Sequence, residues 1–451
     1  MNGKIYLALS ILLIAGCTAP APNEGTSDNF SYISAGLKER TNYTPRQDHE
    51  SGQFEFPEWV TLDDGLSQDE AIALALWNNA QFQADLSALG FARADLLEAK
   101  MLSNPVFSIL FPVSPELLEA ALDIPIDVLW QRPHRVAAAK LDAKKLSENL
   151  IENGLGLVRD VQITYTELLL TQKRITLTST EAQLQFQINQ LNQSRLRAGD
   201  VSQLAVTDSY VDTLRATDAI QRLSKEADVL KQKLNSLLGI TSDDLIFDIV
   251  PLEIPPVSTE SVEEILKTAF ICRPDLRAAE LAIEAAGERI GWEKSKVYNF
   301  IAVLHGDDTE PEGDDTEPEN ESFIVRPGFS VEIPIFNQNE AKVEHAKAEL
   351  EQAAKQYQAV RQNIALEVKQ AYTQYVSAHE QFDLWDNDII PSLEQAVEQT
   401  QKSYEAGDVS LIAVLQATRA LVEARIYLTE LAARLNSSTA KLNYFIGKKM
   451  I

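Results

Sequence analysis

Metal binding and nucleophilic catalysis need histidine, cysteine or acidic side chains at characteristic spacings, and this sequence does not provide them. Its five histidines are never within metal-ligand spacing of one another or of a cysteine: His49, His134, His305, His345 and His379. The sequence also lacks the G-x-S-x-G motif, a phosphate-binding loop and a dinucleotide fingerprint. We therefore expect no metal site, no cofactor and no enzymatic activity.

Cys17 is the residue whose position does predict a covalent modification. Lys4 is followed by an apolar run, Ile5–Ile14, which is too short to span a bilayer and is typical of a secretory signal. The run ends in Ile14-Ala15-Gly16-Cys17, which resembles the lipobox of bacterial lipoproteins, where cleavage precedes the cysteine and the thiol is acylated. We predict a signal peptide over residues 1–16 and a lipid on Cys17, and Thr18 favours the outer membrane. An ordinary signal with an incidental cysteine is the alternative.

The charge balance excludes nucleic acid as a partner. The 451 residues include 40 Lys and Arg against 67 Asp and Glu, which gives a formal net charge of −27. Binding to phosphates requires clustered cations, and the basic residues here are scattered among acidic ones.

From residue 66 onward the sequence consists of two copies of one unit. Ala198-Gly199-Asp200-Val201-Ser202 recurs 208 residues later as Ala406-Gly407-Asp408-Val409-Ser410. Upstream, Tyr165 matches Tyr372 at an offset of 207, and Asn78-Asn79-Ala80 matches Cys272-Arg273-Pro274 at 194. The first repeat therefore covers 66–240, a linker covers 241–259, and the second repeat covers 260–451.

Two segments fall outside this repeated pattern. Residues 17–65 are rich in Pro, Asn, Ser, Thr and Asp without apolar periodicity, and we interpret them as an extended, lipid-anchored tether. The second repeat carries an acidic tract, with nine Asp and Glu residues between Asp307 and Glu321. Such low-complexity sequence is typical of a solvated loop, and calcium binding is the less favoured alternative because the spacing lacks the pattern of a helix-loop-helix site.

Each repeat predicts the same order of elements. A helical pattern (66–102 or 260–297) precedes two β-like stretches, which are Val106–Val113 and Ala121–Leu129, or Phe300–His305 and Phe323–Phe336. Helices without Gly or Pro follow over 157–198 and 340–390, and return helices follow over 201–238 and 409–446. At about 1.5 Å per residue, a helix from Arg135 to Ala198 extends roughly 95 Å. That length exceeds what a globular core needs.

The second return helix carries a narrow apolar seam at intervals of seven residues: Val414, Leu421, Leu428, Leu435 and Leu442. A lone hairpin cannot bury such seams, so we expect the helices to pack laterally against neighbours, as in a closed cylinder. A soluble coiled-coil rod is the alternative. It does not explain the paired β stretches, whose lengths suit the tilted strands of a membrane barrel.

Several segments resemble the TolC family of outer-membrane efflux channels. They are the block Arg273–Glu280 (RPDLRAAE), the strand Val331–Phe336 (VEIPIF) and the turn Tyr404–Ser410 (YEAGDVS). The resemblance covers roughly residues 66–447, and the run Leu421–Leu428 is similar to the heavy-metal-efflux branch of the family.

This resemblance implies a mainly α fold with a small β part. Long antiparallel helical hairpins would form an α-barrel, and each chain would give four strands to a twelve-stranded membrane β-barrel in a homotrimer. Four strands cannot close a barrel, and the bilayer does not tolerate open backbone groups, so trimerisation is also a physical requirement. The implied function is a passive exit duct in the outer membrane of a Gram-negative bacterium, fed by an inner-membrane pump through a periplasmic adaptor.

The resemblance also implies roles for the two turns. Ala198–Ser202 and Ala406–Ser410 would be the tips that contact the adaptor, although simple helix reversal explains them equally well. Some family members narrow the tunnel with two aspartates after the second tip, where this chain has Ala413 and Gln416. The matching positions of the first repeat are Ala205 and Asp208, so Asp208 is our candidate for a pore-facing ring of charge. The Asp or the Ser that follows each glycine can cap the return helix, and we expect Asp200 and Asp408 to be caps rather than pore-facing charges.

Three functions remain open at this point. An efflux duct for small solutes, either metal cations or drugs, is favoured by the lipobox and by the metal-branch-like C-terminal run. A protein-secretion duct is the alternative within transport. A lipid-anchored coiled coil that bridges the envelope without conducting is the alternative of another class.

Overall fold

The computed structural model describes residues 26–46, 54–61, 65–110, 119–240, 248–252, 254–255, 260–308 and 323–449. Cys17, the signal peptide and most of the acidic tract lie outside these residues. The chain forms two compact units. The first comprises Met1–Ile33, Ser87–Ser147 and Ala278–Gln356, and the second comprises Ser34–Leu86, Glu148–Arg277 and Tyr357–Ile451. Both repeats contribute to each unit.

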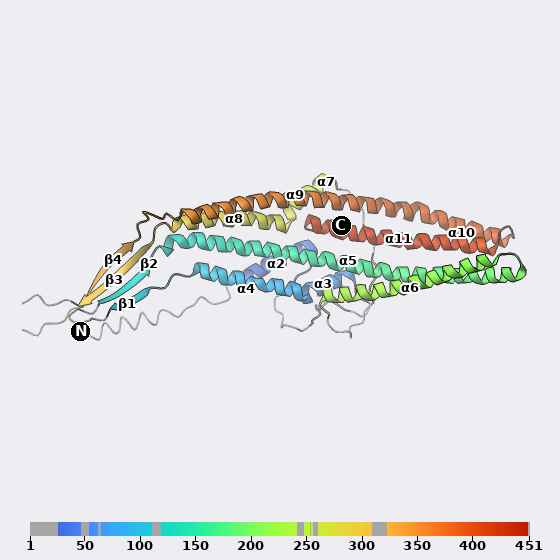
Figure 1. Ribbon diagram of the computed structural model, residues 1–451, viewed down its shortest axis with the longest axis horizontal. Coiled ribbons are helices and arrows are strands. Elements are labelled where there is room, and N and C mark those ends of the chain that lie inside the picture. Colours follow the sequence, from blue (N-terminus) through green and yellow to red (C-terminus); the bar gives the residue numbers. More distant parts are fainter. Residues whose placement is uncertain are drawn as a thin grey trace, which may run out of the picture. The chain divides into compact units, whose positions relative to one another are not determined.

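Each repeat contains two short helices, one very long helix and a return helix (Figure 1). The first repeat has α3 Gln68–Asn78, α4 Ala80–Lys100, α5 Val128–Ala198 and α6 Gln203–Leu238. The second has α7 Val262–Cys272, α8 Pro274–Ser295, α9 Glu340–Leu384, the π-helix η1 Trp385–Ile389, α10 Ile390–Glu405 and α11 Leu411–Ile446. The predicted helical hairpins are thus confirmed. Among the described residues, no helix combines the length and apolarity needed to cross a bilayer.

The initial helical pattern of each repeat is divided into two helices. Each begins with a capping box, formed by Ser67 with Glu70 and by Ser261 with Glu264. The break falls at Asn79 in the first repeat and at Arg273 in the second, which are equivalent positions. Pro274 has no backbone N–H and favours a helix start, which explains the second break.

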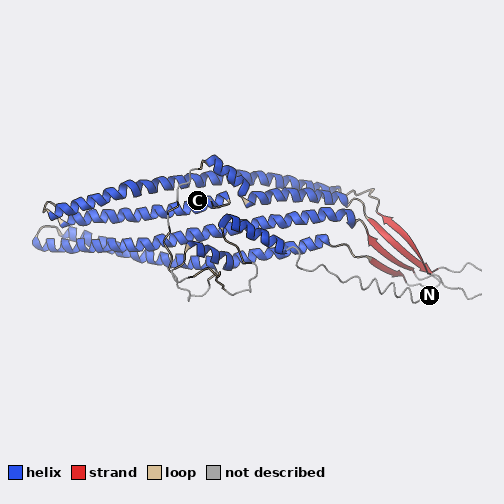
Figure 2. Cartoon of the chain, turned by 180° about the vertical axis from the view of Figure 1, so that it is seen from behind, coloured by secondary structure: helices blue, strands red, loops and turns tan. Residues whose placement is uncertain are grey.

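The first unit holds one four-stranded antiparallel sheet in the order β1-β2-β3-β4 (Figure 2). Its strands are β1 Val106–Leu110, β2 Glu119–Pro125, β3 Phe300–Asp308 and β4 Phe323–Val331. The central pair joins the two repeats, because Leu122 of β2 lies opposite Leu304 of β3. The prediction of two strands per repeat is confirmed.

The strand boundaries differ from those expected. The fourth strand ends at Val331, and the apolar residues that follow, Ile333 and Phe336, are exposed outside the sheet. The second strand ends at Pro125, before helix α5 begins. Asp307 and Asp308, the first residues of the acidic tract, belong to β3 rather than to a loop, because they pair with Ile324 and Phe323 of β4.

The expectation of an extended tether is wrong for residues Thr26–Thr41, which form helix α2. Ile33 and Leu37, one helical turn apart, are fully buried. In the second unit, Leu37 packs closely at Gly154 of α5, where a β-carbon would come within 2.7 Å of the leucine side chain. The sequence analysis missed this helix although Phe30, Ile33 and Leu37 fall at helical spacing, because most of the residues around them are polar or small.

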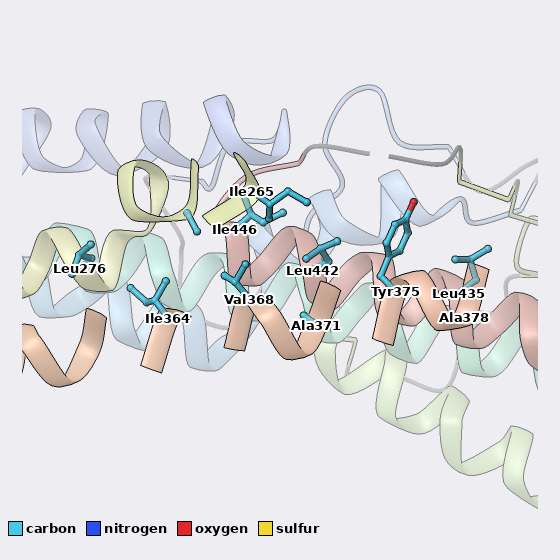
Figure 3. Close-up of a cluster of buried hydrophobic side chains, with 11 residues drawn as sticks. Ile265, Leu276, Ile364, Val368, Ala371, Tyr375, Ala378, Leu435, Leu442 and Ile446 are labelled. Atoms are coloured by element: carbon cyan, nitrogen blue, oxygen red, sulfur yellow. The ribbon is translucent and has the colours of Figure 1, made fainter. Parts of the chain in front are cut away.

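One core cluster of the second unit is a seam between α9 and α11 that α7 closes at one end (Figure 3). Its α9 members recur every three or four residues: Ile364, Val368, Ala371, Tyr375 and Ala378. Helix α11 contributes Leu435 and Leu442, which are fully buried, and Val414 and Leu421 of the same seam are nearly so. The seven-residue seam predicted on α11 is therefore confirmed.

The repeats share contacts as well as sequence. The Tyr165 hydroxyl donates to the Leu66 carbonyl at 2.7 Å, and the Tyr372 hydroxyl donates to the Glu260 carbonyl at 3.3 Å. The tyrosines differ by 207 positions and their acceptors by 194, which are the two offsets found in the sequence. The extra residues of the second repeat therefore lie between Glu260 and Tyr372, and the hydrogen bond that joins these two residues is preserved.

Candidate functional site

The first candidate tip reverses the chain between α5 and α6 through a left-handed glycine. Gly199 has φ +87° and lies where an added β-carbon would contact nothing within 4 Å. The Gly199 amide donates to the Leu196 carbonyl and the Asp200 amide to the Arg195 carbonyl, each at 2.9 Å. These two bonds form a Schellman motif, so the glycine is required by backbone conformation rather than by space.

The second tip repeats this geometry between α10 and α11. Gly407 has φ +86°, and its amide donates to the Tyr404 carbonyl, while the Asp408 amide donates to the Ser403 carbonyl, each at 2.9 Å. The return helices begin after Ser202 and Ser410 as N-cap residues. The expectation that Asp200 and Asp408 are the caps is therefore wrong, because each follows the glycine in the Schellman motif, two positions before the N-cap.

Both tips expose apolar side chains. Leu204 is 67% exposed just after the first turn, and Val409 and Leu411 are 36% and 39% exposed at the second. Both turns lie at the same end of the second unit (Figure 1). This end combines two rigid turns with apolar and acidic side chains, an arrangement suited to docking another protein.

Asp208, the candidate for a pore-facing ring, is exposed on α6, whereas Val206 and Ser209 beside it are buried. In the part of the chain that the structure describes, no hydrogen bond or ion pair engages the carboxylates of Asp200, Asp208 or Asp408. The structure therefore leaves Asp208 a free charge near the tip, and it does not bring the three aspartates together.

The two hairpins of the second unit lie side by side, with α5 next to α11. Arg174 of α5 pairs with Glu430 of α11 at 3.2 Å. Nearer the tips, Arg419 of α11 lies 3.9 Å from Glu181 of α5. Burial raises the pKa of Glu181, and nearby Glu423 raises it further, while Arg419 lowers it. The helices thus pack laterally within one chain, as the sequence pattern indicates.

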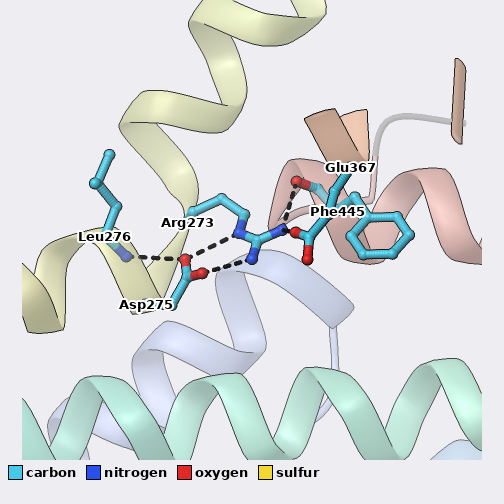
Figure 4. A network of polar contacts seen from close by, with 5 residues as sticks. All are labelled: Arg273, Asp275, Leu276, Glu367 and Phe445. Atoms are coloured by element: carbon cyan, nitrogen blue, oxygen red, sulfur yellow. Dashed lines mark hydrogen bonds and ion pairs between the residues drawn. The ribbon is translucent and has the colours of Figure 1, made fainter. Parts of the chain in front are cut away.

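Arg273 joins three elements of the second unit (Figure 4). Its guanidinium forms a fork with Asp275, in which Nε lies 2.9 Å from Oδ1 and Nη2 lies 2.5 Å from Oδ2. Nη1 donates to Oε2 of Glu367 on α9 at 2.9 Å and to the Phe445 carbonyl on α11 at 3.3 Å. The side chain is only 5% exposed. The acidic partners raise the pKa of Arg273 although burial opposes them. The RPDLRAAE block thus fixes the second hairpin to α8.

Glu152 of α5 faces the same region, and its side chain is partly buried. Burial raises its pKa, whereas a hydrogen bond from Tyr444 and the charge of Arg273 lower it. Its Oε2 atom is buried and has no hydrogen-bond partner. Sequence reasoning did not single out Glu152, because nothing in its neighbours along the chain distinguishes it from Glu148, Glu167 and Glu181 of the same helix.

The second repeat matches a known protein family. Residues 265–448 match the family described as Outer membrane efflux protein. Over 387 residues the chain is 23% identical to the cobalt-zinc-cadmium resistance protein CzcC of Cupriavidus metallidurans, covering 85% of this chain and 90% of that protein. It is 29% identical over 161 residues to the cation efflux system protein CusC of Escherichia coli K12, which is 35% of each chain.

Solved structures share the fold over most of the chain. The crystal structure of CusC superposes with a TM-score of 0.67 at 19% identity, covering 89% of this chain and 99% of that one. The outer-membrane channel OprN gives a TM-score of 0.67 at 16% identity, covering 90% and 96%. The fold of this chain is therefore the one seen in these outer-membrane channels.

Proposed function

Because the chain belongs to the TolC family of outer-membrane efflux channels, we propose that it is the outer-membrane exit duct of a tripartite efflux system. The observation that carries this proposal is that each repeat contains both a strand pair and a long helical hairpin. Each repeat supplies two strands to one sheet and one long hairpin to the helical part. A duct of this kind conducts passively, so the energy for export comes from the pump.

The sheet supports a homotrimer as the conducting form. Its edge strands are β1 and β4, and a four-stranded sheet leaves both edges unpaired within one chain. Phe107 of β1 and Phe329 of β4 are 61% and 76% exposed, as expected of strands that face lipid. Three copies joined edge to edge close a twelve-stranded barrel and satisfy every backbone group in the bilayer. Light scattering of the protein in detergent should give the mass of three chains.

Conduction is the decisive test of the duct. Purified trimers inserted in a planar bilayer should carry an ion current. A correctly inserted trimer that carries none would instead support a structural coiled coil that bridges the envelope. The names of the relatives, a cobalt-zinc-cadmium resistance protein and a cation efflux system protein, favour metal cations as the solute. Deletion of the gene should therefore sensitise the host to zinc or cobalt, and sensitivity to drugs alone would contradict the metal assignment.

The two tips are proposed to dock the periplasmic adaptor. Their exposed apolar residues and rigid turns support this assignment. The substitution Val409→Asp should weaken adaptor binding in a pull-down assay, because it adds a charge to the apolar contact. Val229→Asp is a matched control, since Val229 is 63% exposed on α6 but lies far from the turn. Equal loss of binding in both variants would contradict docking at the tips.

The acidic tract is proposed to face the cell exterior. It connects β3 to β4, which pair as one hairpin, and outer-membrane barrels place their longer loops outside. A protease site inserted near Gly313 should be cut on intact cells. Cleavage that requires a permeabilised outer membrane would place the tract in the periplasm.

A further inference from the structure

Helix α4 of the first repeat lacks one of the neighbours that its equivalent, α8, has in the second. Within the first unit the helices follow the order α4, α5, α8, α9 (Figure 1). Helix α8 therefore has a helix on each side, and its Ala285 is fully buried, whereas the equivalent Phe91 of α4 is 72% exposed. A repeat buries its apolar face against the next repeat, so the open side of α4 indicates a contact with another chain.

The repeat identifies the missing neighbour. Inside the chain, α8 of the second repeat packs on α5 of the first, where Arg289 pairs with Asp142 at 2.6 Å and His134 lies 2.8 Å from Glu288. Equivalent short helices differ by 194 positions and equivalent long helices by 207, so the equivalent contact joins α4 to α9. These are the two outer helices of the unit. When protomers close a ring, α4 of one chain therefore meets α9 of the next.

Side-chain sizes at this contact support the equivalence. Gly291 of α8 faces His134 of α5, and a β-carbon on this glycine would lie 2.7 Å from the imidazole. The equivalent residues are Leu97 of α4 and Ala341 of α9. The bulky residue thus changes sides, and in each case a small residue faces it. Close-packed contacts that share one geometry require this kind of complementarity.

The charges at the two contacts differ. One groove inside the chain is lined by four residues of this contact, among others: Ala138, Asp142, Arg289 and Trp292. Their equivalents between chains are one histidine and three acids, given in the same order: His345, Glu349, Asp95 and Glu98. Carboxylates thus take the places of the arginine and the tryptophan. Three carboxylates brought together at a contact between chains need a counter-charge, which a bound cation would supply.

The four side chains are also of the types that bind a transition metal. His345 and Glu349 lie one turn apart on α9, with Nδ1 3.4 Å from Oε1, and their side chains are 76% and 40% exposed. Asp95 and Glu98 lie one turn apart on α4, and both are exposed. In the part of the chain that the structure describes, no hydrogen bond or ion pair engages Asp95 or Glu98. One imidazole combined with carboxylates suits Zn²⁺ or Co²⁺.

The basic residues nearby have partners elsewhere. Arg289 is already paired within its own chain. Arg135 of α5 donates to the Ala99 carbonyl of α4, in its own repeat, at 3.0 Å. Its equivalent Lys342 likewise acts on Glu293 of α8, which is the equivalent of Ala99. These cations therefore do not neutralise the acids between chains.

We propose that neighbouring protomers share a divalent transition-metal site, formed by His345 and Glu349 of one chain with Asp95 and Glu98 of the partner subunit. A trimer then holds three ions, each bound by nitrogen and oxygen atoms at about 2.0–2.2 Å. Within one chain, the described residues contain no cluster of three or more potential metal ligands, so the site is incomplete without the partner. Spacing along the sequence gave no sign of it for the same reason. The inference rests on the proposed homotrimer and not on conduction.

Zinc binding by the purified trimer tests the site. After metals are removed with a chelator, calorimetric titration with Zn²⁺ should show a class of sites that numbers three per trimer. His345→Gln should weaken this binding by at least about tenfold, because even a disturbed outer shell costs that much. His379→Gln is the matched control, since His379 forms the other histidine–carboxylate pair of α9, with Asp383 at 2.9 Å. Equal loss in both variants, or no loss in either, would overturn the site.

A charge reversal tests the geometry. Asp95→Arg places between the chains the arginine that Arg289 supplies inside the chain. It should abolish the three zinc sites and make the melting temperature of the trimer independent of chelator, whereas chelator should lower that of the wild type. Dissociation of the trimer by Asp95→Arg would contradict the assigned contact. A trimer that binds zinc but carries no ion current would refute the duct and support the site, and a conducting trimer without zinc sites would refute the site alone.

Discussion

Arg273 Nη1 lies 2.9 Å from Glu367 Oε2, and this contact joins the break between α7 and α8 to the long helix α9. Asn79 occupies the equivalent position of the first repeat, where its amide donates to the Leu237 carbonyl at 3.0 Å. The Arg273 side chain likewise reaches the Phe445 carbonyl, which is the equivalent acceptor. The second repeat thus keeps the hydrogen bond to the equivalent backbone carbonyl, now from a charged donor, and adds two carboxylate partners.

Loss of the Arg273 side chain should therefore be severe. Arg273→Ala leaves the carboxylates of Asp275 and Glu367 without their buried partner, and we expect a loss of about 3 kcal/mol in the free energy of unfolding. Arg273→Lys should recover only part of this, because an ammonium cannot form the two-pronged contact with Asp275. Arg222→Ala removes an exposed ion pair of α6 and should cost less than about 1 kcal/mol. Thermal melts followed by circular dichroism measure all three, and equal effects of Arg273→Ala and Arg222→Ala would contradict the assigned role.

Glu152 should make stability depend on pH. Burial raises its pKa in the folded protein, so the folded state retains a proton that the unfolded state releases above its ordinary pKa near 4.5. This contribution stabilises the fold at acid pH and is lost as the pH rises through the folded-state pKa. Glu152→Gln should therefore raise the melting temperature at pH 8 more than at pH 5. Glu226→Gln, at an exposed position of α6, should leave the melting temperature unchanged at both pH values. A similar shift from both variants would assign the effect to net charge.

The left-handed glycines that follow α5 and α6, Gly199 and Gly239, should differ in their tolerance of alanine. At Gly199 an added β-carbon meets nothing within 4 Å. Gly199→Ala should therefore lower the free energy of unfolding by only about 1 kcal/mol, the cost of placing alanine in the left-handed conformation. At Gly239 the φ is +76° and the β-carbon would lie 2.1 Å from the Asn78 carbonyl oxygen, so Gly239→Ala should be much more destabilising or prevent folding. Melting temperatures of the two variants decide this. A larger loss at Gly199 would show that the tip is packed against another part of the assembly.

Asp208 should influence ion selectivity. In a trimer it forms a ring of three exposed charges near the tip, and such rings favour cations. Asp208→Asn should lower the preference for cations or raise conductance in a planar bilayer. Asp218→Asn, also exposed on α6 but ten positions further from the tip, should have the smaller effect. Unchanged selectivity and conductance in Asp208→Asn would place this residue away from the pore.

Lipidation at Cys17 is tested by labelling. Cys17→Ser should abolish incorporation of labelled palmitate, while the barrel still inserts, because a closed set of strands holds the membrane far more strongly than acyl chains. Cys272→Ser is the matched control and should retain the label. A mature N-terminus other than Cys17 would contradict the lipobox assignment.

The sequence alone determined the repeat, the hairpins and the tips. Offsets of 194, 207 and 208 locate equivalent residues, and the recurring glycine turns and seven-residue seam specify where helices reverse and which face they bury. These features are local or periodic, so they can be read along the chain. The change of offset from 207 to 208 shows that the second hairpin has one extra residue, but the π turn Trp385–Ile389 was not predicted and is seen only in the hydrogen-bonding pattern.

Tertiary structure decided the rest. Whether the short, mostly polar segment Thr26–Thr41 becomes helix α2 depends on the space that Gly154, which is distant in sequence, leaves for Leu37. Whether the aspartate or the serine of each turn caps the return helix depends on the Schellman geometry, which places Asp200 and Asp408 before the N-cap serine. The raised pKa of Glu152 and the ion pairs of Arg273 arise from burial among helices of both repeats. Burial and charge pairing are set by contacts between distant segments, and a pattern along the chain does not contain them.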